Sequence, residues 1–199
     1  MNWFERIPKV ELHLHLEGAI PHAALWELVQ KYGGDPSLPD LAALQQRFVF
    51  RDFPHFIEMW VWKNQFLREY EDFTFIAEAV ARDLANQNIR YAEVFYSPID
   101  FARHGLHVQP LTEAIRAGLA RVPEIDVALI TDFDRGFGAE NAARTLAEVC
   151  EVRDLGIVGV GLGGLELQYP PELFTEVYAQ ARELGFHTTA HAGEAAGAA

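Results

Sequence analysis

How this chain folds is decided by one stretch near its start, Val10-Glu11-Leu12-His13-Leu14-His15-Leu16-Glu17-Gly18. Apolar and polar residues alternate along it. Alternation with a period of two predicts a β-strand and places His13 and His15 on the same face. Same-face neighbours on a strand lie about 7 Å apart, so two imidazoles at this spacing can bind one metal ion. A His-x-His pair by itself is equally compatible with a polar strand face that binds no metal.

The composition is that of a globular protein of one domain, which we expect to span residues 1–199. Half of the residues are hydrophobic, and the net charge of −13 with no cluster of Lys or Arg argues against binding to nucleic acid. Cys150 is the only cysteine, so an internal disulfide is excluded. No apolar run approaches the roughly 20 residues of a membrane span, and the start does not have the pattern of a signal peptide. We therefore expect a soluble, cytoplasmic protein that does not interact with membranes.

Strand patterns alternate with helix patterns along the rest of the chain. The further strands are expected at Tyr91–Tyr96, Asp126–Asp134, Ile157–Leu162 and Phe186–Ala192. The helices are expected at His22–Tyr32, Leu38–Gln46, Asp72–Asn86, Leu111–Arg121, Ala139–Asp154 and Pro171–Leu184. This alternation predicts an α/β protein with parallel strands joined by right-handed crossovers. A doubly wound sheet and a (β/α)8 barrel both fit, and histidines on the first and fifth strands favour the barrel, because a closed ring aims distant strands at one point.

A third histidine follows the fifth predicted strand, in Thr188-Thr189-Ala190-His191-Ala192-Gly193-Glu194. Three neutral imidazoles at one end of a sheet are typical of a zinc site, and we expect one zinc ion bound by His13, His15 and His191. A catalytic zinc lowers the pKa of bound water toward about 7. The carboxylate of Glu194 then suits proton transfer, although an acid at this place also stabilises a helix N-terminus.

An aromatic segment between the second and third predicted helices has a helical pattern. Phe53, Phe56, Ile57 and Trp60 recur at the i, i+3, i+4, i+7 spacing of one helix face. The pattern predicts either an ordinary buried helix face or an apolar wall over a flat ligand.

The chain resembles the adenosine deaminase family in four motifs that occur in family order. They are Pro8-Lys9-Val10-Glu11-Leu12-His13-Leu14-His15-Leu16-Glu17-Gly18-Ala19, Tyr91-Ala92-Glu93-Val94-Phe95-Tyr96-Ser97-Pro98, Gly161-Leu162-Gly163-Gly164-Leu165-Glu166 and Thr189-Ala190-His191-Ala192-Gly193-Glu194. The resemblance implies a (β/α)8 TIM barrel, of which this chain holds about the first five β/α units. It also implies a zinc enzyme that replaces the 6-amino group of a purine with oxygen and releases ammonia.

The resemblance also implies roles for individual residues. His13, His15 and His191 would bind zinc, and Glu194 would protonate the ring nitrogen beside the attacked carbon. Glu17 would face the sugar, and the backbone N–H of Gly164 would donate to a purine nitrogen. The aromatic residues Phe53, Phe56, Ile57 and Trp60 would cover the purine.

Three departures from the family pattern bear on the substrate. Glu17 stands where many adenosine deaminases have Asp, Leu165 replaces an acid, and Phe95 replaces an Arg. The expected substrate is adenosine or deoxyadenosine, and the alternatives are adenine or a 5′-modified nucleoside such as aminodeoxyfutalosine. The resemblance itself does not fix the oligomeric state.

Family members continue for about three more strands, which carry a further histidine and an aspartate pair. We therefore expect a domain truncated on its C-terminal side and an inactive 199-residue chain. A different metal-dependent hydrolase of the same fold is an alternative, although the fourth strand lacks the lysine that bridges two metals in many of them. A remnant without activity that binds a partner is a third reading.

Overall fold

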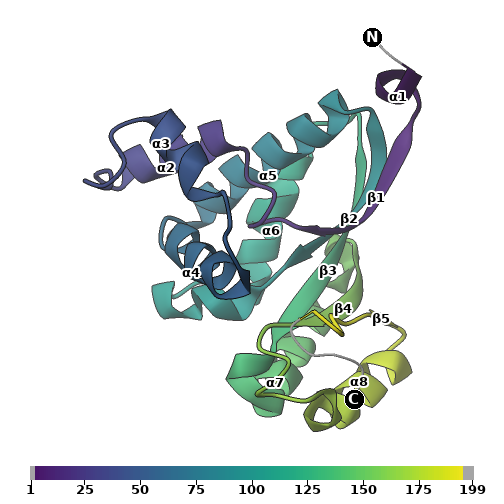
Figure 1. Cartoon of the computed structure of the whole chain (residues 1–199). Helices are drawn as coiled ribbons and strands as arrows, with labels where there is room; N and C mark the ends of the chain where they lie inside the picture. The colour runs from purple at the N-terminus through teal and green to yellow at the C-terminus, as the bar shows by residue number, and fades with distance from the viewer. Residues whose placement is uncertain (1–2, 195–199) are drawn as a thin grey trace.

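A computed structural model of the protein describes residues 3–194 and contains one parallel sheet (Figure 1). Its strands are β1 (Lys9–His15), β2 (Ile89–Tyr96), β3 (Asp126–Asp134), β4 (Ile157–Gly163) and β5 (His187–Thr188). They neighbour one another in chain order, from β1 to β5. Strand order that never reverses is typical of a barrel, whereas a doubly wound sheet reverses at its switch point. The predicted parallel pairing is confirmed, and the strand order favours the barrel.

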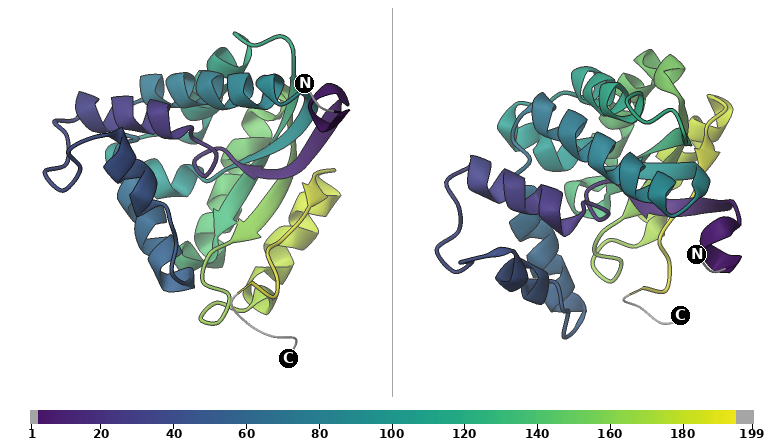
Figure 2. Two further views of the ribbon diagram at one scale, coloured as in Figure 1. Left: turned by 45° about the horizontal axis from the view of Figure 1, so that its top comes forward. Right: turned by 90° about the horizontal axis from the view of Figure 1, so that it is seen from above.

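Helices connect successive strands, and several of them pack against one face of the sheet (Figure 2). They are α1 (Trp3–Arg6), α2 (His22–Lys31), α3 (Leu41–Arg47), α4 (Phe53–Asn64), α5 (Tyr70–Asn86), α6 (Val108–Leu119), α7 (Gly138–Glu151) and α8 (Thr175–Glu183). Short 3-10 turns complete the chain at η1 (Pro98–His104), η2 (Arg135–Phe137), η3 (Arg153–Leu155) and η4 (Pro171–Phe174). Helix α5 packs against α6 and β2, α7 packs against β3, and α8 packs against β5.

The hydrophobic core lies between the sheet and these helices. Its side chains come from both layers, as in Phe73 and Ile76 of α5, Leu111 and Ile115 of α6, and Val94 of β2, all without measurable exposure. Helix α5 begins at a capping box, in which the side chains of Glu69 and Asp72 each accept from the other's backbone N–H. This cap starts the helix two residues earlier than the apolar pattern predicts.

Strand β1 departs from the predicted alternation. Its register with β2 shifts between Glu11 and Leu14, where β1 has one residue more than β2. Leu12 consequently lines a hollow of about 290 Å³ on the inner face of the sheet, together with Phe95 and Ile130. Strict alternation would place Leu12 on the same face as Leu14, and the extra residue interrupts it, because it reverses the side on which the following side chain lies.

Strand β5 is shorter than predicted. Only His187 and Thr188 meet the criteria for a strand, against the expected range Phe186–Ala192. The backbone nevertheless stays beside β4, because the N–H of Thr189 donates to the carbonyl of Val160 and the N–H of His191 donates to that of Leu162. The ladder thus carries His191 to the carboxyl end of the sheet.

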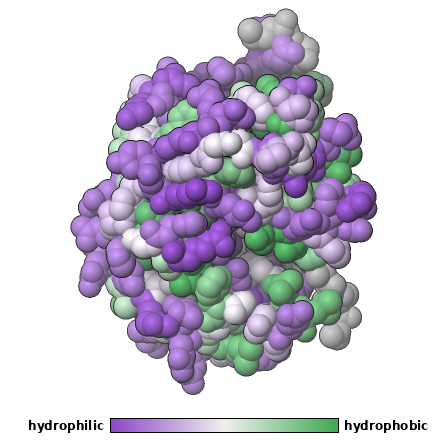
Figure 3. Space-filling model, turned by 90° about the vertical axis from the view of Figure 1, so that its left-hand side faces the viewer, coloured by the Kyte–Doolittle hydropathy of each residue, from purple (hydrophilic) through white to green (hydrophobic). Residues whose placement is uncertain are grey.

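One face of the molecule is mostly hydrophilic, with apolar side chains in small separate patches (Figure 3). Among residues 3–194, every helix is too short or too polar to cross a lipid bilayer.

Candidate metal centre

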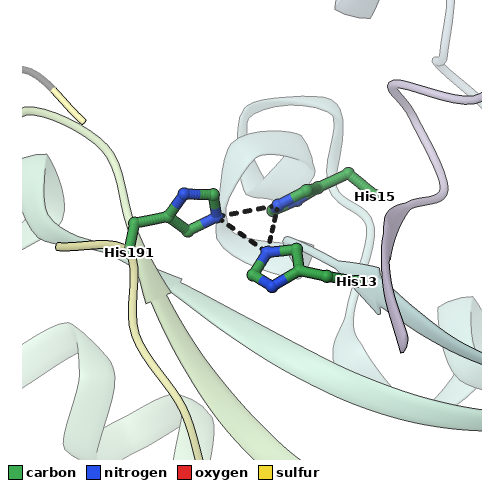
Figure 4. Close-up of side chains that lie close together, drawn as sticks. All are labelled: His13, His15 and His191. Atoms are coloured by element: carbon green, nitrogen blue, oxygen red, sulfur yellow. Dashed lines mark hydrogen bonds between the residues drawn. The ribbon is translucent and has the colours of Figure 1, made fainter. Parts of the chain in front are cut away.

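Three histidine side chains meet at the carboxyl end of the sheet (Figure 4). His13 and His15 belong to β1, and His191 belongs to the segment that continues β5. The Nε2 atom of His191 lies 3.0 Å from that of His13 and 2.9 Å from that of His15, and the last two atoms are 3.3 Å apart. Within residues 3–194, no other group of three or more His, Cys, Asp or Glu side chains brings its ligand atoms together in this way.

The three contacts between these nitrogens cannot all be hydrogen bonds. A hydrogen bond needs one nitrogen that carries a proton and one that offers a lone pair, and each Nε2 is in one of these states at a time. Among three nitrogens in mutual contact, at least two share a state, so at least one contact is unfavourable. One cation removes the conflict, because nitrogens 2.0–2.1 Å from a tetrahedral zinc ion lie roughly 3.3 Å apart. The residues present therefore fit a metal ion.

Burial keeps two of these imidazoles in the neutral form that binds metal. The pKa of His15 is lowered to about 3, first by burial and then by the neighbouring His191 and His13. Burial and His191 also lower the pKa of His13, while Glu11 and Glu194 oppose that shift. A neutral imidazole offers its lone pair without first losing a proton.

Glu194 stands directly beside the three histidines. Its Oε2 atom lies 3.2 Å from Nδ1 of His191. The backbone N–H groups of Gly193 and Glu194 donate to the two carboxylate oxygens of Glu166, at 2.8 and 3.2 Å. Glu166 therefore holds the loop that carries the candidate proton-transfer residue. The structure places Glu194 at the site, and its role in proton transfer stays a prediction.

Two buried ionisable side chains at the carboxyl end of β3 were not predicted. Asp132 Oδ2 lies 3.8 Å from Nδ1 of His15, and burial raises the pKa of Asp132 well above its ordinary value, with Glu17 adding to the shift. Arg135 is 1% exposed and donates from Nη2 to the carbonyl of His191 at 2.7 Å. The available signal was an acidic residue inside the apolar part of the strand and an arginine directly after it.

The four predicted lid residues form a row on α4. The ring of Trp60 lies 5.8 Å from that of His15, and Phe56 and Phe53 follow at successive centroid distances of 6.0 Å. These three residues and Ile57 are all half-buried. The buried residues of α4 are Met59, Lys63 and Asn64, so the row is less buried than these three. Its role as a wall over a flat ligand stays a prediction.

Glu17 and Lys63 are two buried ionisable residues that influence each other's charge. Glu17 is 1% exposed and accepts a hydrogen bond from the backbone N–H of Ser97 at 3.1 Å. Burial raises the pKa of Glu17 and lowers that of Lys63 to about 7, and each charge opposes the other's shift. The ammonium of Lys63 lies 3.5 Å from the ring centroid of Trp60. Glu17 is therefore buried two residues after His15, and its predicted contact with a sugar stays a prediction.

Gly164 follows β4 at the same end of the sheet. It is exposed and has a φ of +93°, a backbone conformation that favours glycine. A Cβ atom there would lie 2.7 Å from Oδ1 of Asp134. The backbone conformation and the nearby Asp134 thus explain why this position is glycine. The backbone N–H of Gly164 stays a candidate donor to a substrate.

A sheet in barrel order with three imidazoles at its carboxyl end defines a barrel protein with a candidate metal centre. Comparison with known proteins identifies the family to which this barrel protein belongs. The profile of the family described as "Adenosine deaminase" matches residues 8–199. The chain belongs to the adenosine deaminase family.

Individual relatives agree with this assignment. An adenine deaminase of Bordetella avium is 36% identical over 196 residues, which cover 97% of this chain and 62% of that protein. The crystal structure of an adenine deaminase from Arthrobacter aurescens superposes with a TM-score of 0.85 at 27% identity, covering 95% of this chain and 58% of that one. An amidohydrolase of Burkholderia ambifaria with bound Zn gives a TM-score of 0.85 at 32% identity, over 96% of this chain and 53% of its own.

The predicted (β/α)8-barrel class is confirmed by these structures, of which the chain matches the N-terminal part. It spans 62% of the length of the Bordetella avium relative.

Proposed function

We propose that this chain is the metal-binding part of a zinc-dependent deaminase, which replaces the exocyclic amino group of an adenine ring with oxygen and releases ammonia. The observation that supports this most directly is the convergence of three Nε2 atoms, from His13, His15 and His191, with the carboxylate of Glu194 beside them. One zinc ion held there supplies a Lewis acid that makes water more acidic.

The side chains around the histidines suit the remaining steps. Glu194 takes a proton from water and delivers it to the ring nitrogen next to the carbon that carries the amino group. Protonation makes that carbon more electrophilic, so the hydroxide left from the water adds to it. The proton of the added hydroxyl then moves to the amino group, the C–N bond breaks, and ammonia leaves. The N–H of Gly164 donates to a second ring nitrogen and orients the base. The half-buried row on α4 covers the flat ring and excludes bulk water.

Adenine is the substrate that we propose first. The curated relatives that are 36% and 33% identical to this chain are adenine deaminases. Glu17, the residue expected to face a sugar, is 1% exposed and bonds to the backbone of Ser97. Both observations favour the free base over adenosine or deoxyadenosine, which the sequence put first.

We also infer that residues 1–199 belong to a single barrel domain whose further strands this chain does not supply. Among the described residues, β1 and β5 each pair with one strand. The hollow on the inner face, which Leu12 and Phe95 line, is the place where a closed barrel packs its interior. Because a five-stranded portion leaves this interior incomplete, we expect the 199-residue chain to bind zinc without turning substrate over.

The test is ammonia release in the presence of zinc, with adenine, adenosine, deoxyadenosine, N6-methyl-AMP and aminodeoxyfutalosine as substrates. One sample is the 199-residue chain, and the other is this chain fused to the part of the Bordetella avium relative that it does not cover. We expect turnover of adenine by the fusion alone. Turnover by the 199-residue chain would contradict the incomplete domain, and an inactive fusion with zinc bound would contradict the deaminase.

Two substitutions in the active fusion test the named roles. Glu194→Gln keeps the size of the side chain and removes its proton acceptor, so turnover falls while zinc stays bound. Loss of zinc from this variant would show that Glu194 holds the metal instead. Glu17→Asp should alter the ranking of the substrates more than the rate on the best one, and an unchanged ranking would remove Glu17 from substrate recognition.

A further inference from the structure

One of the three histidines has a buried carboxylate behind it. The Nε2 atom of His15 points at the other two histidines, at 3.3 and 2.9 Å, so its Nδ1 atom lies on the far side of the ring. There it faces Oδ2 of Asp132 at 3.8 Å. The two side chains are 20% and 5% exposed, so bulk water has little access to this contact.

The facing nitrogen of His15 and the second oxygen of the Asp132 side chain both lack a partner among the described residues. Nδ1 of His15 and Oδ1 of Asp132 are both buried without a hydrogen-bond partner in the part of the chain that the structure describes. An unpaired buried polar group costs about 1–3 kcal/mol, so a hydrogen bond from Nδ1 of His15 to the side chain of Asp132, whose Oδ2 atom lies 3.8 Å away, is favoured. A movement of about 1 Å brings them to hydrogen-bond length.

Strand β4 is shaped around the carboxylate of Asp132. A Cβ atom at Gly161 would come within 2.4 Å of Oδ1 of Asp132, and one at Gly163 would come within 2.8 Å of Oδ2. Both distances are shorter than any tolerated contact. The side chain of Asp132 therefore fits only because β4 has glycine at both positions. Asp132 is also not part of the ligand cluster, because the atoms that converge belong to the three histidines.

We propose that Asp132 is a positioning residue for the candidate zinc site, which accepts a hydrogen bond from Nδ1–H of His15 and leaves the lone pair of Nε2 directed at the metal. This inference rests on the proposed zinc site. A histidine ligand that donates its second ring N–H to a carboxylate is held in one tautomer and one ring orientation, which raises its basicity toward the metal. The carboxylate of Asp132 thus determines which ring nitrogen of His15 keeps a lone pair for the metal.

The first test compares zinc affinity among wild type, Asp132→Asn and Asp132→Ala, by competition with a chromophoric chelator. A change in this outer shell is expected to weaken zinc binding by about 10–100-fold. Asp72→Asn is the matched control, because Asp72 is 1% exposed and bonds to Lys31 and Tyr32 rather than to a histidine. We expect its zinc affinity to stay within about twofold of wild type, with folding checked by circular dichroism.

Equal zinc affinity in wild type and folded Asp132 variants would overturn the inference and leave the zinc site intact. Absence of zinc binding by wild type would instead overturn the proposed function. A second measurement needs no substitution: long-range ¹H–¹⁵N correlation of the imidazoles in the metal-free wild-type chain. We expect His15 in the Nδ1–H form, and a proton on Nε2 would overturn the inference even if every Asp132 variant failed to fold.

Discussion

The two faces of the sheet in this protein carry different kinds of side chain. The outer face packs apolar side chains against α5 and α6 until residues such as Phe73 and Ile115 have no exposure. The inner face carries the histidines of β1, the carboxylate of Asp132 and a hollow of about 290 Å³. Stability is therefore expected to reside mainly in one face and metal binding in the other, and substitutions should separate the two properties.

The largest effect is expected from truncation of the outer face. Phe73 has no exposure, and its ring meets that of Phe101 edge-on at 4.7 Å. Phe73→Ala should lower the free energy of unfolding by about 3–5 kcal/mol, because the cavity collapses only in part. Urea denaturation measures this, with Phe4→Ala as the control, since Phe4 is 71% exposed. Equal losses in the two variants would show that the buried layer is not the source of stability.

Removal of a ligand on the inner face should give the converse result. His13 is exposed and belongs to a strand at the edge of the sheet, so His13→Ala is expected to unfold at the same urea concentration as wild type. Its zinc affinity should fall more than about 100-fold, beyond the range of outer-shell changes. His104→Ala, at an exposed histidine of η1, is the control for chelator titration. Undiminished zinc binding by His13→Ala would remove His13 from the site.

Lys63 is a buried residue of helix α4, and its proton makes the free energy of unfolding depend on pH. Its folded-state pKa is about 7, against an ordinary value of 10.5. Between those values the unfolded chain holds this proton and the folded chain does not, so stability rises with pH by about 1.4 kcal/mol per unit. Lys63→Met lacks this rise. The unfolding free energy of wild type minus that of the variant should increase from pH 7 to pH 10. A constant value would mean that folded Lys63 stays charged over this range.

The smallest effect is expected from the exposed carboxylate of the inner face. The side chain of Glu194 is 40% exposed, whereas that of Asp132 is 5% exposed, although each approaches the Nδ1 atom of a histidine. Water replaces a lost partner at an exposed site, so Glu194→Gln should change zinc affinity by less than about threefold. A larger loss than in Asp132→Asn would reverse the ranking of the two carboxylates.

The sequence allowed the strands, their order and the three histidines to be predicted, because period and position carry that information. Alternation identifies β1, and the ends of strands β1 and β5 locate His13, His15 and His191. The position of Leu12 was not predictable in this way, because a register shift depends on the neighbouring strand.

The supporting side chains escaped prediction for a related reason. The role of Asp132 depends on His15, more than a hundred residues away, and on two glycines of a third strand. Lys63 has a residue type that is mostly exposed, and only packing under Trp60 shows that it is buried. Such contacts exist only between elements, so no local pattern encodes them.

The position of β3 has a consequence for how the protein opens. It lies in the middle of the sheet and pairs with β2 from Tyr91 to Tyr96 without a register shift. Amide hydrogens of a central strand exchange with solvent only in large opening events, while those of edge strands exchange in local ones. Hydrogen exchange should therefore protect Asp132 longer than His13 or His191. If the edge strands β1 and β5 open locally, Asp132 therefore stays in place in β3. It can then orient His15 again when β1 closes.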